Sequence, residues 1–242
     1  MNEVVLYQPP TRPWGTPNMS PFCAKLETYL RMTEIPYRTS SSGILRGAPK
    51  GKVPWIEVDG TTIGDSQLVI EELERRLAAD GKGALDAGLS PRDAALGHVV
   101  RRTIEEAFYF VGVYARWQAD AGYQVVRDEF RKLVPAAIAV PIVRRAMKRK
   151  LHFQGTGRHS PDEAMAMGAA DLDAIAELLG DRPFVLGDAP RIVDCALYAF
   201  VEAILGPPID NAVRRAVAGR ANLVAYRARV RGRWWKDLPP LA

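Results

Sequence analysis

The chain has 242 residues, of which 48% are hydrophobic and 25% are charged, as in an ordinary globular protein with a sizeable core. Its net charge of +5 falls short of the strongly basic balance typical of nucleic-acid-binding proteins, and the sequence holds no RNA-binding motif and no metal-ligand cluster. No apolar run approaches the roughly 18 residues that a membrane-spanning helix needs. The two cysteines are far apart in sequence, which argues against a disulfide framework and for a reducing compartment. The first residues also lack the features of a signal peptide, so we expect a cytoplasmic protein.

The first 80 residues alternate between strand patterns and helical patterns. The predicted elements, in order, are a strand at 4–7, a helix at 20–33, a strand at 35–39, a hairpin at 53–63 that turns at Asp59-Gly60, and a helix opened by residues 64–66. The apolar face of the last helix comprises Val69, Leu73 and Leu77. We therefore predict an α/β domain over residues 1–82.

The rest of the chain has helical patterns only. Small residues over 83–89 predict a linker, and residues 90–242 predict an all-helical domain. Ser90-Pro91 begins a long helix, whose predicted buried face consists of Leu96, Val100, Thr103, Ala107, Val111 and Tyr114. The largely apolar segment 194–205 is expected at the centre of this domain.

Ser20-Pro21 has the sequence of a helix start, with serine as the N-cap and proline as the first helical residue. The free N–H groups of such a helix end and its positive partial charge favour a bound anion, and we expect this anion to be a thiolate. A free thiol titrates near 8.5, and lowering its pKa by about two units needs about 2.7 kcal/mol. A hydroxyl hydrogen bond together with the helix end can supply stabilisation of that order. The alternative role of Ser20 is helix capping alone.

Three motifs of the first 70 residues carry a family resemblance. Ser20-Pro21-Phe22-Cys23 is similar to the thiol-activating turn of thioredoxin-like folds, residues 51–60 contain a Val-Pro pair before a hairpin, and Gly64-Asp65-Ser66 opens a helix with an acidic-Ser pair. Together these motifs resemble the glutathione transferase superfamily, in which such an acidic-Ser pair opens the glutathione-binding helix. More narrowly, residues 20–32, 154–160 and 184–194 resemble the branch that contains the failed-axon-connections and metaxin-like proteins.

The resemblance implies a fold and a ligand. The fold is an α/β thioredoxin-like N-terminal domain, with a mixed four-stranded sheet and helices, followed by an all-α C-terminal domain. The ligand is glutathione, acting as co-substrate.

The resemblance also assigns residues to glutathione binding. It implies a cis Val53-Pro54 bond that turns the backbone of Val53 toward the cysteinyl part of glutathione, the alternative being a trans proline on an edge strand. Ser66 would bind the γ-glutamyl carboxylate and Asp65 the ammonium group, in addition to capping their helix. Lys52 would contact a glutathione carboxylate or remain a solvated loop residue.

Three residues are candidates for the chemistry. Ser20 is the first of them. Tyr7 ends the first strand, where Tyr-type transferases carry their catalytic hydroxyl, although a core tyrosine is the simpler interpretation. Cys23 resembles the second cysteine of a Cys-x-x-Cys pair whose first member is replaced by Ser20, so it is either a small packed residue or a monothiol.

The apolar substrate would be bound by aromatic residues. Tyr109, Val113 and Trp117 lie in an aromatic-rich segment after the predicted linker, and Trp14 lies in the loop before Ser20. Aromatic residues at helical spacing are more often core than ligand contacts, so only some of them are expected to face a pocket.

Arginine-rich features stand apart from the motifs above. The family places Ser or Thr three residues before Asp194, but here the residue is Arg191, so the reciprocal helix cap is expected to be lost. The basic clusters over residues 144–150 and 227–233 are interpreted as solvated faces, with a peripheral membrane contact as the minor alternative.

The sequence thus predicts a glutathione transferase-like enzyme that activates the glutathione thiolate against an electrophilic, apolar small molecule. A homodimer is expected from the family habit, and neither a nucleic-acid partner nor a membrane contact is expected. The alternative is a non-catalytic glutathione- or ligand-binding scaffold protein of the metaxin-like type. A third, weaker hypothesis is a thiol-disulfide oxidoreductase that acts through Cys23.

Overall fold

The structure is a computed structural model that describes residues 3–131 and 139–241. Its first part contains β1 (Val4–Tyr7), η1 (Pro13–Gly15), α1 (Pro21–Met32), β2 (Tyr37–Ser40), β3 (Trp55–Val58), β4 (Thr61–Gly64) and α2 (Ser66–Ala79). Its second part begins with α3 (Pro91–Arg102), η2 (Thr103–Phe108), α4 (Tyr109–Val113), η3 (Tyr114–Gln118) and α5 (Asp120–Arg131). It continues with α6 (Ala139–Gln154), η4 (Thr156–Arg158), α7 (Pro161–Leu179), α8 (Ile192–Leu205), α9 (Ala212–Gly219) and α10 (Ala221–Trp234).

The four strands form one mixed sheet in the order β2-β1-β3-β4. β1 pairs in parallel with β2, whereas β1 with β3 and β3 with β4 pair antiparallel. The parallel pair is possible because α1 connects β1 to β2, and the antiparallel pair β3–β4 is closed by the Asp59-Gly60 turn, in which both residues have positive φ. The predicted thioredoxin-like sheet followed by an all-helical part is confirmed.

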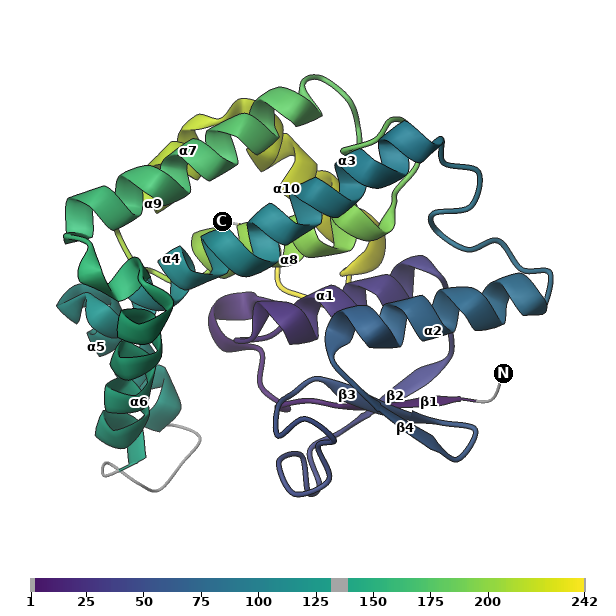
Figure 1. Ribbon diagram of the computed structural model, residues 1–242, viewed down its shortest axis with the longest axis horizontal. Coiled ribbons are helices and arrows are strands. Elements are labelled where there is room, and N and C mark those ends of the chain that lie inside the picture. Colours follow the sequence, from purple (N-terminus) through teal and green to yellow (C-terminus); the bar gives the residue numbers. More distant parts are fainter. Residues whose placement is uncertain (1–2, 132–138, 242) are drawn as a thin grey trace.

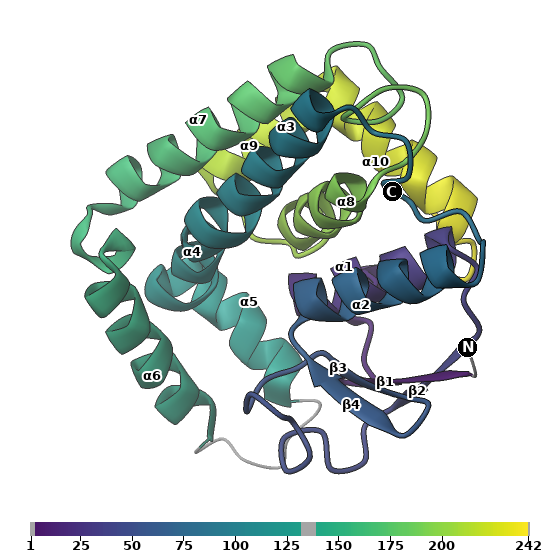
Figure 2. The same ribbon diagram turned by 45° about the vertical axis from the view of Figure 1, so that its right-hand side comes forward.

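Helices α1 and α2 lie side by side on one face of this sheet (Figures 1 and 2). Both begin at the predicted residues. Ser20 caps α1 by accepting a hydrogen bond from the N–H of Cys23, and Asp65 caps α2 by accepting from the N–H groups of Gln67 and Leu68. Val69, Leu73 and Leu77 are buried against the sheet, as their spacing predicts.

Helix α8 lies at the centre of the helical part and packs against α1 (Figure 1). Nearly all of its residues are buried, and a single cluster of buried apolar side chains runs from β1 through α8 to α10. The two parts of the chain therefore share one hydrophobic core. Within the described ranges, no helix is both long enough and apolar enough to cross a membrane.

The predicted buried face of the long helix after residue 90 is partly wrong. Ala107 is exposed, whereas Ile104 and Phe108 are buried together with Val100 and Val111. The reason is that η2, which contains Ile104, Ala107 and Phe108, is a π-helical segment that interrupts the α-helix and shifts the buried face by one position. A strict 3.6-residue period carried through η2 assigns the wrong residue to the core.

The expected loss of the helix cap at Arg191 is also corrected. Asp194 still accepts a hydrogen bond from the N–H of Arg191 at 2.8 Å. The first free N–H of α8, that of Ile192, donates to Asp86 at 2.9 Å, so the segment before α3 supplies the missing cap. The Arg191 guanidinium donates to the carbonyl oxygens of Leu85 and Ala87 and holds this segment in place.

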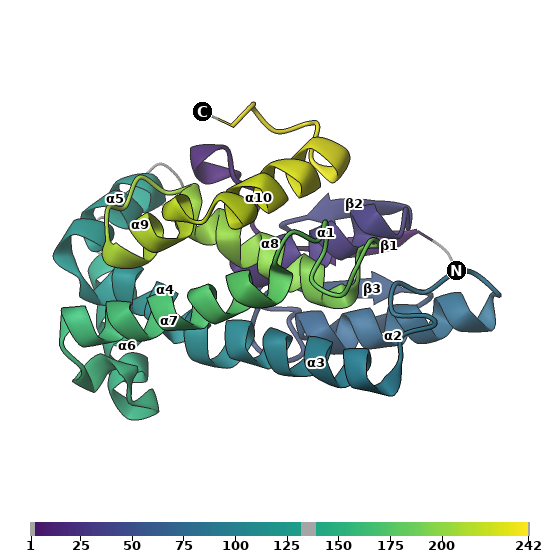
Figure 3. The ribbon, with the colours of Figure 1, turned by 90° about the horizontal axis from the view of Figure 1, so that it is seen from above.

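The arginine-rich run in α10 is not a solvated face throughout. Arg231 is 6% exposed and pairs with the buried carboxylate of Glu202 in α8, which Arg227 also contacts. Arg231 donates further hydrogen bonds to the carbonyl oxygens of Gly15 and Pro239. It thereby joins η1 and the C-terminal segment to α8, and these segments lie close together in Figure 3. The sequence pattern of α10 could not distinguish these inward arginines from exposed ones.

Candidate functional site

Two cavities meet at the N-terminus of α1. The larger has a volume of about 1340 Å³ and lies between the α/β part and the helical part. The smaller has a volume of about 280 Å³ and is lined mainly by apolar side chains. The residues that line both cavities are Ser20, Tyr109, Val113 and Met147.

The larger cavity contains every residue that the sequence assigns to glutathione binding. Lys52, Val53, Pro54, Asp65, Ser66 and Ser20 all line it. The Val53-Pro54 peptide bond is cis, as the family resemblance implies. Residues from the loop before β3, from the start of α2 and from the start of α1 are therefore brought to the same cavity, although Ser20 and Ser66 are more than 40 positions apart in sequence.

The start of α2 presents polar groups to this cavity. Asp65 has a φ of 84°, a region that a residue with a side chain rarely adopts, and its carboxylate caps the helix. Ser66 is 5% exposed, and its hydroxyl has no hydrogen-bond partner among the described residues. As the first residue of α2, Ser66 also has a backbone N–H without an intrahelical acceptor. This helix end can therefore bind a carboxylate through the N–H and the hydroxyl of Ser66.

The Ser20 side chain lies at the junction of the two cavities. The Ser20 hydroxyl oxygen accepts a hydrogen bond from the backbone N–H of Cys23 at 3.4 Å. The backbone N–H of Ser20 donates to the side-chain oxygen of Asn18 at 3.0 Å. Capping uses this hydroxyl only as an acceptor, so its hydrogen remains available to a thiolate. The capping role and the thiolate-binding role of Ser20 are thus compatible.

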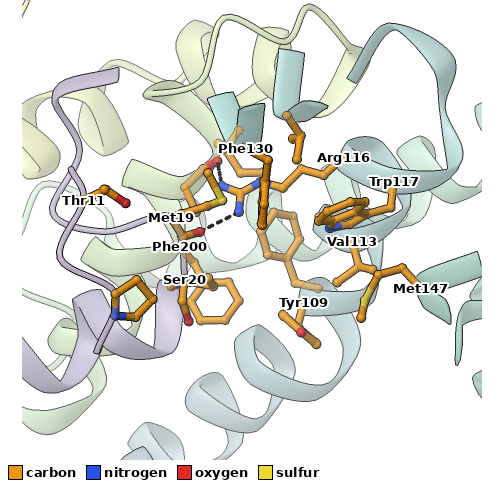
Figure 4. A pocket seen from close by; sticks show the side chains of 17 residues that line it. Thr11, Met19, Ser20, Tyr109, Val113, Arg116, Trp117, Phe130, Met147 and Phe200 are labelled. Carbon is orange, nitrogen blue, oxygen red and sulfur yellow. Dashed lines mark hydrogen bonds between the residues drawn. The ribbon is translucent and has the colours of Figure 1, made fainter. Parts of the chain in front are cut away.

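The smaller cavity holds three of the four residues that the sequence proposes for the apolar substrate. Tyr109, Val113 and Trp117 project into it from successive helical turns (Figure 4). Tyr109 makes edge contacts with Phe22 and Phe200, at ring-centroid distances of 5.0 and 6.4 Å. Burial raises the pKa of Tyr109, so its hydroxyl stays protonated at neutral pH.

Two predicted site residues lie elsewhere. Tyr7 follows the buried residue Leu6 in β1, so its side chain points to the opposite face of the sheet from α1. There it stacks on Trp55 with a centroid distance of 3.7 Å and donates a hydrogen bond to Glu57, which raises the pKa of Tyr7. Trp14 belongs to η1 and lines neither of the two cavities. Neither residue is placed where it could contact a substrate bound there.

Cys23 is completely buried, one turn inside α1. Burial raises the pKa of its thiol to about 12, so it is not a thiolate at neutral pH. We expect native protein at pH 8 to resist iodoacetamide at Cys23, and we expect Cys23→Ala to retain glutathione-dependent activity within about twofold. Peptide mass spectrometry with and without denaturant measures the labelling. Rapid labelling of the native protein, or loss of activity in a folded variant, would revive the monothiol hypothesis.

The sequence missed several residues of the smaller cavity. Arg116, Phe130, Met147 and Phe200 line it and come from four different helical segments. Arg116 could have been noticed as a single cation between Tyr109 and Trp117 in an otherwise apolar and aromatic run. The others carry no local signal, because only the packing of α5, α6 and α8 brings them to the same place.

The basic cluster of α6 is divided between two roles. Arg144 donates to the carbonyl oxygens of Trp117 and Gln118 and pairs with Asp120, so it fastens α6 to the end of η3. Arg149 and Lys150 line the larger cavity instead. The interpretation of this cluster as a solvated face is therefore incomplete.

Comparisons with known proteins agree with this architecture. Residues 21–122 match the glutathione S-transferase N-terminal domain, and residues 168–230 match the glutathione S-transferase C-terminal domain. The chain is 34% identical over 230 residues to isoprene-epoxide–glutathione S-transferase of Rhodococcus sp. (strain AD45), covering 90% of this chain and 94% of that protein.

More distant relatives are also similar over most of this chain. Failed axon connections of Drosophila melanogaster is 27% identical, covering 91% of this chain and 56% of the relative. Human metaxin-1 is 22% identical, covering 88% of this chain and 47% of the relative, so the chain spans about half the length of these two proteins.

Solved structures share the fold. Glutathione S-transferase III in its apo form superimposes with a TM-score of 0.65 at 17% identity, over the whole of both chains. Beta-etherase LigF from Sphingobium sp. strain SYK-6 superimposes with a TM-score of 0.62 at 17% identity, over 95% of each chain. The domain matches, the Rhodococcus relative and the shared fold together show that this chain belongs to the glutathione S-transferase superfamily.

Proposed function

We propose that the protein transfers glutathione to an electrophilic, apolar small molecule. The observation that carries this proposal is the place of Ser20, at the junction of a polar cavity and an apolar one. Glutathione would lie in the larger cavity, with its γ-glutamyl carboxylate at Ser66 and its thiolate against Ser20. The electrophile would occupy the smaller cavity, beside Tyr109 and Trp117. The Rhodococcus relative is an isoprene-epoxide–glutathione S-transferase, which supports an electrophile such as a small epoxide.

A non-catalytic role is the second candidate function. It is favoured by the similarity to Failed axon connections and metaxin-1, which covers about nine-tenths of this chain. In that case the same cavities would hold glutathione or another ligand without turnover. The homodimer and the cytoplasmic location expected from the sequence stay predictions.

A binding measurement followed by an activity measurement tests the proposal. We expect wild-type protein to bind immobilised glutathione and to form a thioether from glutathione and isoprene epoxide, detected by mass spectrometry. We expect Ser66→Ala to weaken glutathione binding about 10-fold or more, because it removes a hydrogen bond to a carboxylate. Ser41→Ala, an exposed serine that lines neither cavity, serves as the matched control.

The outcomes distinguish the transferase role from the non-catalytic role. Failure of the wild-type protein to bind glutathione contradicts both the transferase and the glutathione-holding role. Binding without thioether formation favours the non-catalytic role. Equal binding by Ser66→Ala and Ser41→Ala would contradict the assignment of the γ-glutamyl carboxylate to the start of α2.

A further inference from the structure

Arg116 places a positive charge in the wall of the apolar cavity (Figure 4). Its guanidinium donates at 2.8 Å to the carbonyl oxygen of Met19 and at 2.8 Å to that of Ala203. No carboxylate pairs with it in the part of the chain that the structure describes. Burial lowers the pKa of Arg116 to about 10, so it remains a cation at neutral pH. Backbone carbonyl groups, and not an acidic side chain of the described residues, therefore compensate this charge.

The two carbonyl contacts fix the position of this charge. Met19 immediately precedes Ser20, and Ala203 lies in the last turn of α8, where the helix dipole is negative. The guanidinium is thus held beside the start of α1 and is partly compensated by the end of α8. A guanidinium has five N–H donors, so hydrogens remain after these two contacts. They can serve an oxygen of a ligand in the cavity.

We propose that Arg116 stabilises negative charge that develops on an oxygen of the electrophile, as it does when an epoxide ring opens. This inference rests on the proposed function. An epoxide is a neutral electrophile whose ring opening places a negative charge on oxygen, which is the charge that a guanidinium can stabilise. The apolar lining of the cavity also suits a neutral molecule.

The reaction balances without a further reagent besides water. The glutathione thiolate attacks a ring carbon of the epoxide, the new C–S bond forms, and the C–O bond breaks with its electron pair going to oxygen. The negative charge of sulfur thus moves to oxygen, beside Arg116. Water then donates a proton, and the product is a hydroxy thioether. A hydrogen bond from a fixed donor to such an oxygen is stronger in the transition state than in the ground state, because the oxygen becomes more negative. It therefore accelerates the reaction.

A pair of electrophiles isolates this role. Styrene oxide and benzyl chloride both offer a carbon next to a phenyl ring, but the first leaves negative charge on oxygen and the second releases chloride, a weaker hydrogen-bond acceptor. We expect Arg116→Met to lower kcat/KM for styrene oxide about 100-fold more than for benzyl chloride. Arg116→Lys, which retains a cation, should restore part of this ratio. Because both rates are measured on one preparation, their ratio does not depend on the folded fraction.

Arg214 provides the matched control. It donates to the carbonyl oxygens of Ile204, Leu205 and Pro207 at the same end of α8, but it lines neither cavity. Arg214→Met should leave the ratio unchanged, even if it lowers the stability of the protein.

The outcomes distinguish this inference from the proposed function. If Arg116→Met lowers both rates equally, Arg116 only holds Met19 and Ala203 in place, and the inference is wrong. Turnover of benzyl chloride without turnover of styrene oxide in the wild-type protein also overturns the inference but leaves the transferase function standing. No turnover of either electrophile, together with no binding of glutathione, overturns both.

Discussion

Replacing Ser20 by alanine should raise the pKa of the bound glutathione thiol from about 6.5 to about 8, short of the value of about 8.5 for a free thiol. The thiolate loses the hydroxyl hydrogen bond, and only the helix N-terminus continues to favour it. At pH 7 the thiolate fraction would fall about eightfold. A more basic thiolate is intrinsically more nucleophilic, so the rate falls less than the thiolate fraction, and the loss disappears above about pH 9. The measurement is the ultraviolet absorbance of the thiolate across a pH titration, together with the pH profile of kcat/KM.

Two further variants at this position separate catalysis from helix capping. Ser20→Ala should also cost about 1 kcal/mol of unfolding free energy, because Cys23 loses its capping acceptor. Ser20→Asp keeps a capping group and should regain this stability, but its carboxylate repels a thiolate and should raise the thiol pKa further. Ser20→Thr retains both the cap and the hydroxyl. If Ser20→Ala loses stability while the thiol pKa stays unchanged, Ser20 is a helix cap only.

Lys25→Met should reduce the free energy of unfolding by about 3 to 5 kcal/mol. Lys25 is completely buried in α1, where it contacts the carboxylate of Glu105 in η2 and donates to Gln67 in α2 at 2.7 Å. Removing the ammonium leaves the buried carboxylate of Glu105 with Arg101 as its remaining ionic partner, at 2.8 Å. Because α1, α2 and η2 meet here, the loss falls on the junction of the α/β and helical parts. Urea denaturation followed by circular dichroism measures it.

An exposed ion pair nearby is the matched control. Arg102 in α3 and Glu106 in η2 are 2.8 Å apart, as are Arg101 and Glu105, but both side chains are about half exposed. Arg102→Met should therefore change the unfolding free energy by less than about 1 kcal/mol. A double-mutant cycle between Lys25→Met and Glu105→Gln should show a coupling energy well above that of the exposed pair. Equal effects for the buried and the exposed pair would contradict this account of the junction.

Local chemistry explains why much of this protein could be predicted from its sequence. Ser20-Pro21 and Gly64-Asp65-Ser66 begin helices because a capping side chain satisfies the free N–H groups of the residues that follow it directly. Asp59-Gly60 closes a hairpin because its two residues accept positive φ. Such signals act over two to four positions, so they are complete within a short stretch of chain. The order of strands and helices, and the six residues assigned to glutathione binding in the larger cavity, followed from them and from the family resemblance.

The tertiary structure decided what depends on residues far apart in sequence. Tyr7 has a hydroxyl and Cys23 a thiol, as the proposed chemistry would need. However, the pleat of β1 turns Tyr7 to the opposite face of the sheet, and burial raises the pKa of the Cys23 thiol. Asp86 caps α8 from more than 100 positions away, and Arg116 enters the apolar cavity because Met19 and Ala203 hold its guanidinium there. The free energy of these contacts depends on distance in space and on exclusion of water, and neither quantity is encoded in a local sequence pattern. The sequence by itself therefore determined where glutathione is expected to bind, whereas packing alone decided which charged side chain lines the apolar cavity.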